Sequence, residues 1–185
     1  VDKNGVIYFT SLSNYLFAVD AGGEEKWRYP IQRSTPVWSS PAIGEDGTIY
    51  VGAAMEGDNE TSKGMFAVNS DGTLKWKFYN PGDVVAGPGI DEDGTIYVGA
   101  YDGEEGKGKM YAINPDGTQK WEFDAEEYIE SSPTIVGDMI YFGSGLNIFY
   151  AINKDGEEQW RFNTPSPEVF STPAVDKEGT IYFGY

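Results

Sequence analysis

One short pattern returns five times along this chain and limits how the chain can fold. It reads "GVIYFTS", "GTIYVGA", "GTIYVGA", "DMIYFGS" and "GTIYFGY", and its Ile-Tyr pairs begin at Ile7, Ile49, Ile96, Ile140 and Ile181. The steps between successive pairs are 42, 47, 44 and 41 residues. Loops of varying length on a constant structural unit produce such an irregular period.

Two further motifs accompany this pattern. One follows each of the first four copies and reads "LFAVDAGGEEKWRY", "MFAVNSDGTLKWKF", "MYAINPDGTQKWEF" and "FYAINKDGEEQWRF", with a Trp nine residues after an Ala. The other precedes each of the last four copies and reads "SSPAI", "AGPGI", "SSPTI" and "STPAV". The tryptophans of the first of these motifs are Trp27, Trp76, Trp121 and Trp160.

Each repeat therefore contains four runs that are typical of β-strands. They are the Ser-Ser-Pro segment, the Ile-Tyr run, the Tyr-Ala-Ile-Asn run and the Lys-Trp-Lys-Phe run, with alternating residues suited to burial. Asp-Gly or a similar pair lies between the first and second runs, and again between the third and fourth, as in β-hairpins. Four antiparallel strands in about forty residues are typical of one β-propeller blade. The predicted fold class is all-β.

The phase of the repeat predicts where the blades begin and end. Residues 1–30 supply strands two to four of a first blade, because the chain opens at a second strand (Val6 to Thr10). Three complete blades follow, at about 39–79, 86–123 and 131–162. Residues 171–185 supply strands one and two of a last blade. The whole chain, 1–185, is therefore expected to be one propeller segment of about four repeats, a partial or half propeller.

These motifs resemble the PQQ-like β-propeller repeats. That fold occurs in quinoprotein alcohol dehydrogenases, in the outer-membrane assembly lipoprotein and in bacterial and archaeal surface repeat proteins. The Ala-x-Asn/Asp…Gly…Trp pattern resembles the tryptophan-docking motif of that family, which implies that Trp27, Trp76, Trp121 and Trp160 pack against a neighbouring blade. The turn before each Trp is a residue shorter than in the dehydrogenases, so the resemblance is at the level of the repeat.

Four repeats are few for this family, so the assembly of the ring has three alternatives. The chain is a fragment of a longer propeller, closes as a small ring, or pairs with a second copy. We favour a homodimer in which two half-propellers complete an eight-bladed ring, because C₂ dimers are common. Ser171 to Val175 would then supply the innermost strand of the first blade, within one chain or between two.

Composition excludes several classes of function. The chain contains no Cys and no His, which removes disulfides, thiolate chemistry, Ser-His-Asp triads and nearly all zinc sites. The formal net charge of −17 makes nucleic acid an unexpected partner, because such a surface repels phosphate backbones. No apolar run is long enough to span a membrane, and no leader is present in this chain. We expect an extracytoplasmic location: secreted, periplasmic or cell-surface.

The acidic turns first suggest calcium but fit a turn better. In "DEDGTIYVGA" the Gly comes fourth and a strand follows, whereas an EF-hand loop needs Gly at the sixth position and Glu at the twelfth. Two long acidic loops between second and third strands could gather a Ca²⁺ if they converge, and solvated loop charge is the alternative. Their candidate metal ligands are Glu56, Asp58, Glu60, Asp102, Glu104 and Glu105. No cofactor is otherwise expected, and PQQ itself is not favoured.

The residues that differ between repeats are the better candidates for function. Directly before the Ser-Ser-Pro-type motif the four copies carry Trp38, Val85, Glu130 and Phe170. The repeat does not demand these residues, and in propellers such segments approach the mouth of the central channel. They are candidate contacts for a ligand or peptide, and packing between blades is the alternative.

The sequence therefore predicts a non-catalytic repeat scaffold that binds a protein or carbohydrate partner. The alternative is a fragment or relative of a PQQ- and Ca²⁺-dependent quinoprotein dehydrogenase. That activity requires a bound quinone and, in many members, a disulfide of adjacent cysteines, which this chain cannot form. A hydrolase with paired carboxylates gains no specific support, because 30 acidic residues will always bring some pair close together.

Overall fold

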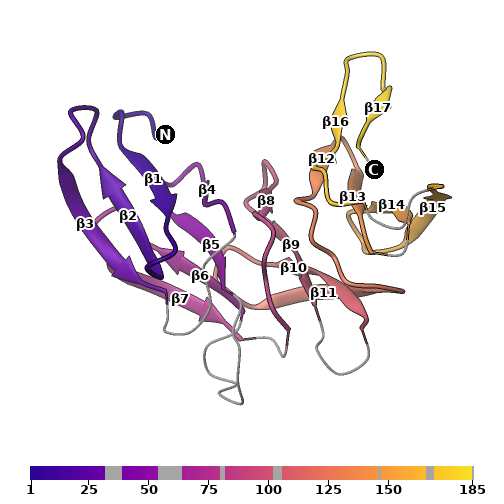
Figure 1. Ribbon diagram of the computed structural model, residues 1–185, viewed down its shortest axis with the longest axis horizontal. Helices are drawn as coiled ribbons and strands as arrows, with labels where there is room; N and C mark the ends of the chain where they lie inside the picture. Colours follow the sequence, from indigo (N-terminus) through magenta and orange to yellow (C-terminus); the bar gives the residue numbers. More distant parts are fainter. Residues whose placement is uncertain are drawn as a thin grey trace. The chain divides into compact units, whose positions relative to one another are not determined.

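A computed structural model describes residues 1–31, 39–53, 64–79, 82–101, 106–145, 147–165 and 169–184 (Figure 1). Within these residues every regular element is a β-strand, as expected for an all-β chain. The chain divides into two compact units, Val1–Pro88 (unit 1) and Gly89–Tyr185 (unit 2), which are described separately. None of the described residues forms a helix long and apolar enough to cross a membrane.

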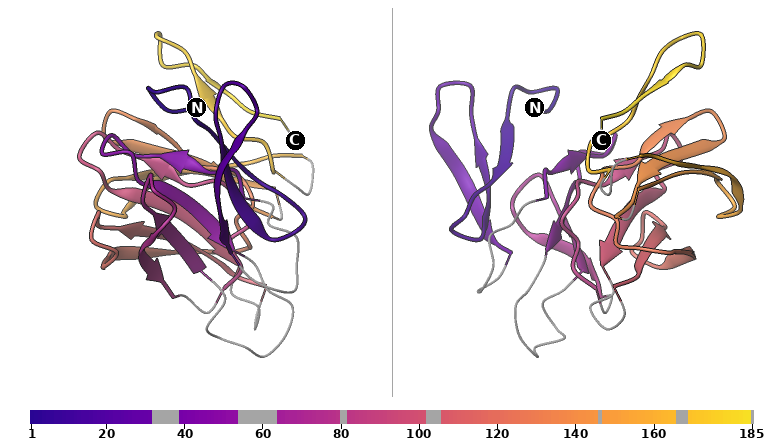
Figure 2. Two further views of the ribbon diagram at one scale, coloured as in Figure 1. Left: turned by 90° about the vertical axis from the view of Figure 1, so that its left-hand side faces the viewer. Right: turned by 45° about the vertical axis from the view of Figure 1, so that its right-hand side comes forward.

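Unit 1 contains two antiparallel sheets, each with its strands in chain order. The first is a three-stranded sheet and the second a four-stranded sheet (Figure 2). The strands of the first sheet are β1 (Ile7–Thr10), β2 (Tyr15–Val19) and β3 (Glu25–Pro30). Those of the second sheet are β4 (Ala42–Ile43), β5 (Ile49–Ala53), β6 (Gly64–Val68) and β7 (Leu74–Phe78).

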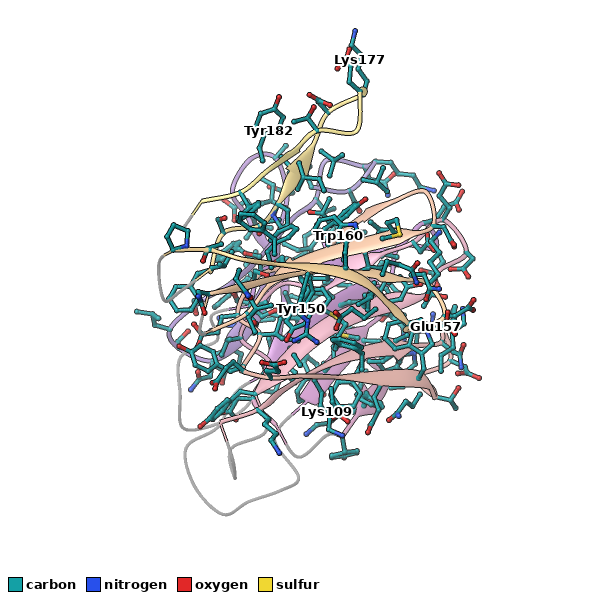
Figure 3. All side chains as sticks on the ribbon, turned by 90° about the vertical axis from the view of Figure 1, so that its right-hand side faces the viewer. Lys109, Tyr150, Glu157, Trp160, Lys177 and Tyr182 are labelled. Atoms are coloured by element: carbon teal, nitrogen blue, oxygen red, sulfur yellow. The ribbon has the colours of Figure 1, made fainter. Side chains whose placement is uncertain are left out.

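Unit 2 contains two four-stranded antiparallel sheets and a two-stranded hairpin. The strands of the first sheet are β8 (Gly89–Ile90), β9 (Ile96–Tyr101), β10 (Gly108–Ile113) and β11 (Gln119–Ala125). Those of the second sheet are β12 (Thr134–Val136), β13 (Met139–Gly143), β14 (Ile148–Asn153) and β15 (Glu158–Asn163). The hairpin consists of β16 (Ala174–Val175) and β17 (Ile181–Tyr182), and carries Lys177 at its turn (Figure 3).

The nine-residue spacing from Ala to Trp has a structural reason. The pairs face each other across neighbouring strands, and the register shifts by one residue immediately after each Ala. Such a β-bulge adds one residue on one strand and bends it locally. The pairs are Ala18↔Trp27, Ala67↔Trp76, Ala112↔Trp121 and Ala151↔Trp160.

The first strand of each four-stranded sheet is shorter than the sequence suggests. The run Ser39 to Ile43 was expected to be extended throughout, but β4 covers only Ala42–Ile43. Pro41 directly precedes this strand, and Pro133 lies directly before β12 in the same way. Proline has no backbone N–H and cannot donate to a ladder, so regular pairing begins only after it.

The hydrophobic core of each unit lies between its successive sheets. In unit 1, Tyr8 and Leu16 of the first sheet pack with Val51 and Phe66 of the second. In unit 2, Tyr97 and Met110 share a cluster with Phe142 and Tyr150. Strands β5 and β9 are apolar and buried in nearly every position.

Candidate functional site

The segments that lead into each new sheet carry one buried apolar residue over a glycine of the preceding sheet. Val84 lies over Gly52, Ile129 over Gly99 and Val169 over Gly143. A Cβ atom at any of these glycines would overlap the side chain above it. Val84, Ile129 and Val169 are almost completely buried. Each connecting segment is therefore fixed in place by a close approach that only glycine permits.

A serine holds the same connections by hydrogen bonds. The Ser131 hydroxyl accepts a bond from the Gly143 N–H at 2.7 Å and donates to the Gly143 carbonyl oxygen at 3.0 Å. Ser171 makes the same two bonds with Gly184, and Ser39 accepts from the Gly52 N–H at 2.9 Å. This is the physical role of the first Ser of the Ser-Ser-Pro motif, whose hydroxyl replaces ladder bonds that the Pro-containing strand lacks.

The candidate contact residues lie between these two fixed points. Val85 is half-buried in unit 1, and Glu130 is exposed in unit 2. Phe170, also in unit 2, is 42% exposed. Trp38 lies outside the described residues, so only three of the four are placed. Glu130 and Phe170 each lie between a buried residue and a serine that is hydrogen-bonded to the sheet, and both side chains are exposed.

Phe170 does not stand alone but belongs to a row of rings in unit 2, here called the aromatic row: Tyr101, Tyr128 and Phe170. The Tyr101 and Tyr128 ring centroids are 5.9 Å apart with the rings nearly perpendicular, and the Tyr128 and Phe170 centroids are 6.3 Å apart with the rings nearly parallel. Offset-stacked and edge-to-face arrangements at such distances are the favourable ones for aromatic pairs.

Tyr128 is the site residue that sequence reasoning missed. Its backbone N–H donates to the Gly106 carbonyl at 3.2 Å, and its carbonyl accepts from the Gly145 N–H at 2.8 Å. A Cβ atom at Gly145 would lie 2.7 Å from the Tyr128 ring, so this glycine allows the ring to lie flat against the backbone. A signal was present, because Tyr128 lies only two residues before Glu130 in the non-repeating segment.

Two of the four repeated tryptophans, Trp27 and Trp121, contact the next sheet of their unit. The Trp27 indole N–H donates to the Ser70 carbonyl at 2.9 Å, and that of Trp121 donates to the Lys154 carbonyl at 2.8 Å. Gly156, in the turn beneath Trp121, has a φ of 84°, and a Cβ atom there would lie 2.9 Å from the indole. Trp76 packs beside Tyr50. Trp160 lies on the outer strand β15, where it packs beside Tyr141 of β13 and is 41% exposed (Figure 3).

The candidate metal ligands all lie outside the described residues: Glu56, Asp58, Glu60, Asp102, Glu104 and Glu105. Within the described part of the chain, no three or more acidic side chains gather in a way that could hold a metal ion. The acidic turns bind their own backbone instead. Asp93 accepts a hydrogen bond from the Thr95 N–H at 2.8 Å, and Asp91 forms an ion pair with Lys154 at 2.5 Å.

The turn at Asp46 makes a pH-dependent contribution to stability. A hydrogen bond from the Lys75 ammonium at 2.8 Å, assisted by the Thr48 N–H, lowers the pKa of Asp46 from 3.8 to about 2. A lowered pKa stabilises the folded state above the unfolded-state pKa, and this contribution is lost as the pH falls through the folded-state value. Because the carboxylate side chain is 57% exposed, solvent screening limits the contribution to about 1 kcal/mol or less.

Replacing Asp46 with Asn is therefore expected to destabilise unit 1 at pH 6 and to have little effect near pH 2. Urea unfolding of both proteins at the two pH values measures the difference. Glu45→Gln, in the same turn, is the control. A difference between Asp46→Asn and the parent chain that is equal at both pH values would contradict the ion pair as its cause.

Unit 1 also contains a cavity between its two sheets, with a volume of about 670 Å³. Its walls come from the start of β2, the end of β3 and the outer strand β7. Four aromatic side chains, Tyr15, Tyr29, Phe66 and Tyr79, line it together with Lys77. Burial is the main cause that raises the pKa of Tyr29, and it also lowers the pKa of Lys77. Sequence reasoning did not identify this cavity.

Comparison with known proteins identifies the family. The family described as outer membrane protein assembly factor BamB matches residues 66–185, which is more than half of the chain. No curated protein matched the sequence.

Several solved structures have a similar fold. BamB from Moraxella catarrhalis matches with a TM-score of 0.73 at 15% identity, over 96% of this chain and 51% of that chain. Quinohemoprotein alcohol dehydrogenase ADHIIG from Pseudomonas putida HK5 matches with a TM-score of 0.72 at 16% identity, over 91% of this chain and 34% of that chain. A protein of unknown function from Bacteroides caccae matches with a TM-score of 0.68 at 16% identity, over 98% and 67%.

At these identities the structural matches show the fold alone, and this chain spans about half of BamB and about a third of the dehydrogenase. The resemblance inferred from the repeated motifs is confirmed. The four-stranded sheets are those of a partial β-propeller with PQQ-like blades. The chain belongs to the PQQ-like repeat family of β-propeller proteins.

Proposed function

We propose that this chain is a non-catalytic propeller scaffold that binds a protein or glycan partner outside the cytoplasm through the aromatic row of unit 2. The observation that carries the proposal is the exposure of Phe170, 42% of which is accessible although Tyr128 stacks on it. A large apolar ring held rigidly at the surface loses little conformational entropy on binding, and such rings dominate binding energy at interfaces.

Three further observations support a binding role rather than catalysis. The chain has no His or Cys to act as an acid, base or nucleophile. Among the repeated residues, Asp93 accepts a hydrogen bond from its own turn, and Trp121 donates one to the next sheet. The description of the matching family names an assembly factor for outer membrane proteins, which supports both binding and an extracytoplasmic location.

A quinoprotein dehydrogenase is the second candidate, because the fold also matches quinohemoprotein alcohol dehydrogenases. That chemistry also requires a calcium ion beside the quinone, and the candidate ligands of the two acidic loops lie outside the described residues. Addition of PQQ with Ca²⁺ tests this candidate. Thermal stabilisation that saturates at a fixed ratio of quinone to protein would favour the dehydrogenase over the scaffold.

The aromatic row is tested by capture of a partner. The immobilised chain is incubated with an extracytoplasmic extract of the source organism, and bound protein and glycan are quantified for the parent chain and for Phe170→Ser. Loss of a central aromatic contact is expected to reduce capture of a specific partner about tenfold or more. Leu12→Ser, which removes another exposed apolar side chain, in unit 1, is the control and should capture as well as the parent. Equal capture by Phe170→Ser would contradict the proposal.

The assembly of the ring remains a prediction. We propose that residues 39–79, 86–123 and 131–162 are complete blades and that a second copy supplies the remainder of an eight-bladed ring. In support, Ile7 and Phe9 of β1 are 39% and 41% exposed, whereas the corresponding Ile49 and Val51 of β5 are completely buried. The mass in solution decides between a dimer and a monomer.

A further inference from the structure

The tryptophan of the last complete repeat lies in different surroundings from two of the others. Trp27 lies over Gly72, where a Cβ atom would be 2.8 Å from the indole. Trp121 lies over Gly156 in the same way, at 2.9 Å. Each of these glycines belongs to the turn between the last two strands of the next sheet. Trp160 occupies the same position on β15, but its side chain is exposed (Figure 3).

One turn of the chain has the matching property. The turn between β2 and β3 carries Gly23, the counterpart of the two glycines beneath tryptophans, with a positive φ of 85°. Nothing in the described part of the chain lies within 4 Å of a Cβ atom built there. Ser70 and Lys154 supply the carbonyl oxygens that accept the indole N–H groups in the two contacts, and Ala21 is their counterpart in this turn. The first sheet therefore offers the turn that such a tryptophan contacts.

The apolar side chains around these two features are complementary as well. Within unit 1, Tyr29 of β3 packs against Phe66 of the next sheet, with ring centroids 6.3 Å apart. By the repeat, Phe162 on β15 is the counterpart of Tyr29. Phe17 on β2 is likewise the counterpart of Phe66, and it stacks with the exposed Phe9 at 5.2 Å. Because side chains alternate along a strand, these two rings lie on the face of the first sheet that points away from the core of unit 1.

We infer that Trp160 and Phe162 of one copy of this chain pack on the first sheet of a second copy. In this contact the indole covers Gly23 of the second copy and donates a hydrogen bond to the Ala21 carbonyl. Phe162 packs against Phe17 of the second copy. A second copy is the partner because the chain itself carries both halves of the contact that joins successive sheets. The inference rests on the proposed pairing of two copies and names its contact residues.

The contact exchanges one strand between the copies. Strands β1 and β17 occupy the same position in the repeat, so only one of them can pair with β16. β17 spans two residues, and Phe183 directly after it stacks on Phe149 at 4.1 Å. β1 spans four residues, and its Phe9 is the counterpart of Phe183. In the pair, β1 of the second copy therefore takes the place of β17, and Phe9 replaces Phe183 on Phe149.

Sedimentation equilibrium at 0.15 M salt measures the association constant of the full chain and of its variants. Trp160→Ala removes the indole. Gly23→Asn keeps the positive φ, which asparagine tolerates, and places a side chain where the indole would lie. Each variant should lower the association constant about tenfold or more. Phe183→Ser removes the competing ring and should raise the association constant about threefold or more. Cooperative urea unfolding shows that each variant is folded.

A mixture of the two weakened variants tests whether the contact joins unlike faces. Trp160→Ala retains the glycine turn and Gly23→Asn retains the tryptophan, so a mixed pair has one intact contact whereas each variant alone has none. The two variants should therefore bind each other at least about threefold more tightly than either binds itself. Phe170→Ser, in the aromatic row, should associate as the parent chain does, which separates this contact from partner capture by the row.

The outcomes distinguish the contact from the pairing itself. A parent chain that remains a monomer would overturn both the contact and the proposed pairing of two copies. A dimer that Trp160→Ala leaves unchanged, or a mixture no tighter than its components, would overturn the contact alone. A loss for Phe170→Ser as large as that for Trp160→Ala would also overturn it, because the aromatic row would then join the copies.

Discussion

Replacement of Trp121 by Ala is expected to lower the free energy of unfolding of unit 2 by about 3 kcal/mol. The indole lies over Gly156, packs beside Tyr97 at 5.7 Å between centroids, and donates a hydrogen bond to the Lys154 carbonyl at 2.8 Å. Its removal leaves a cavity between two sheets and an unsatisfied carbonyl. Chemical unfolding followed by the fluorescence of the remaining tryptophans or by circular dichroism measures the loss.

Trp160 provides the matched control, since it occupies the same position in the next sheet. It is 41% exposed, and the rings beside it are Tyr141 and Phe149 of its own sheet. We therefore expect Trp160→Ala to cost about 1 kcal/mol, well below Trp121→Ala. Equal losses for both variants would show that the contact with the next sheet contributes little to stability.

Gly143→Ala is expected to destabilise unit 2 by about 3 kcal/mol, because the new methyl group would overlap both the side chain and the carbonyl oxygen of Val169. Neither side of this contact can yield easily, since the Ser131 hydroxyl holds the Gly143 backbone by two hydrogen bonds and the Ser171 hydroxyl holds the Val169 segment to Gly184. A thermal or urea unfolding transition measures the effect.

Gly184 occupies the position of Gly143 one repeat later, and there is room for a Cβ atom there. A Cβ atom there would lie 3.6 Å from the Ser171 hydroxyl, an ordinary contact. Gly184→Ala should therefore change the unfolding free energy by less than about 0.5 kcal/mol. If Gly143→Ala were equally mild, the packing of Val169 over Gly143 would not be a fixed point of the fold.

The sequence was sufficient to predict the sheets but not the site. Period and turn chemistry act locally, so the Asp-Gly turns and the Ala-to-Trp spacing predicted antiparallel strands and their order. The resemblance led us to expect contacts of all four tryptophans with a neighbouring blade, and Trp27 and Trp121 donate hydrogen bonds to the next sheet. The short extent of the first strands was not predicted, because the missing N–H of Pro41 or Pro133 limits pairing only within a ladder.

The site depends on contacts between segments that are distant in sequence. Tyr128 contacts Gly106, Gly145 and Phe170, and no local pattern distinguishes this tyrosine from the repeated ones. The cavity of unit 1 arises in a similar way, from residues of β2, β3, β6 and β7 that meet only in the folded unit.

The glycine beneath each connecting segment allows one residue to hold the segment in place while the next residue is available for recognition. The anchor is a buried Val or Ile over a glycine, followed in two of the three described copies by a hydrogen-bonded serine, Ser131 or Ser171, and it does not involve the side chain between them. Positions 85, 130 and 170 can consequently exchange valine, glutamate and phenylalanine at small cost to folding. A fold of this kind can acquire new recognition by single substitutions, and the same three positions offer a protein engineer a ready place to graft side chains.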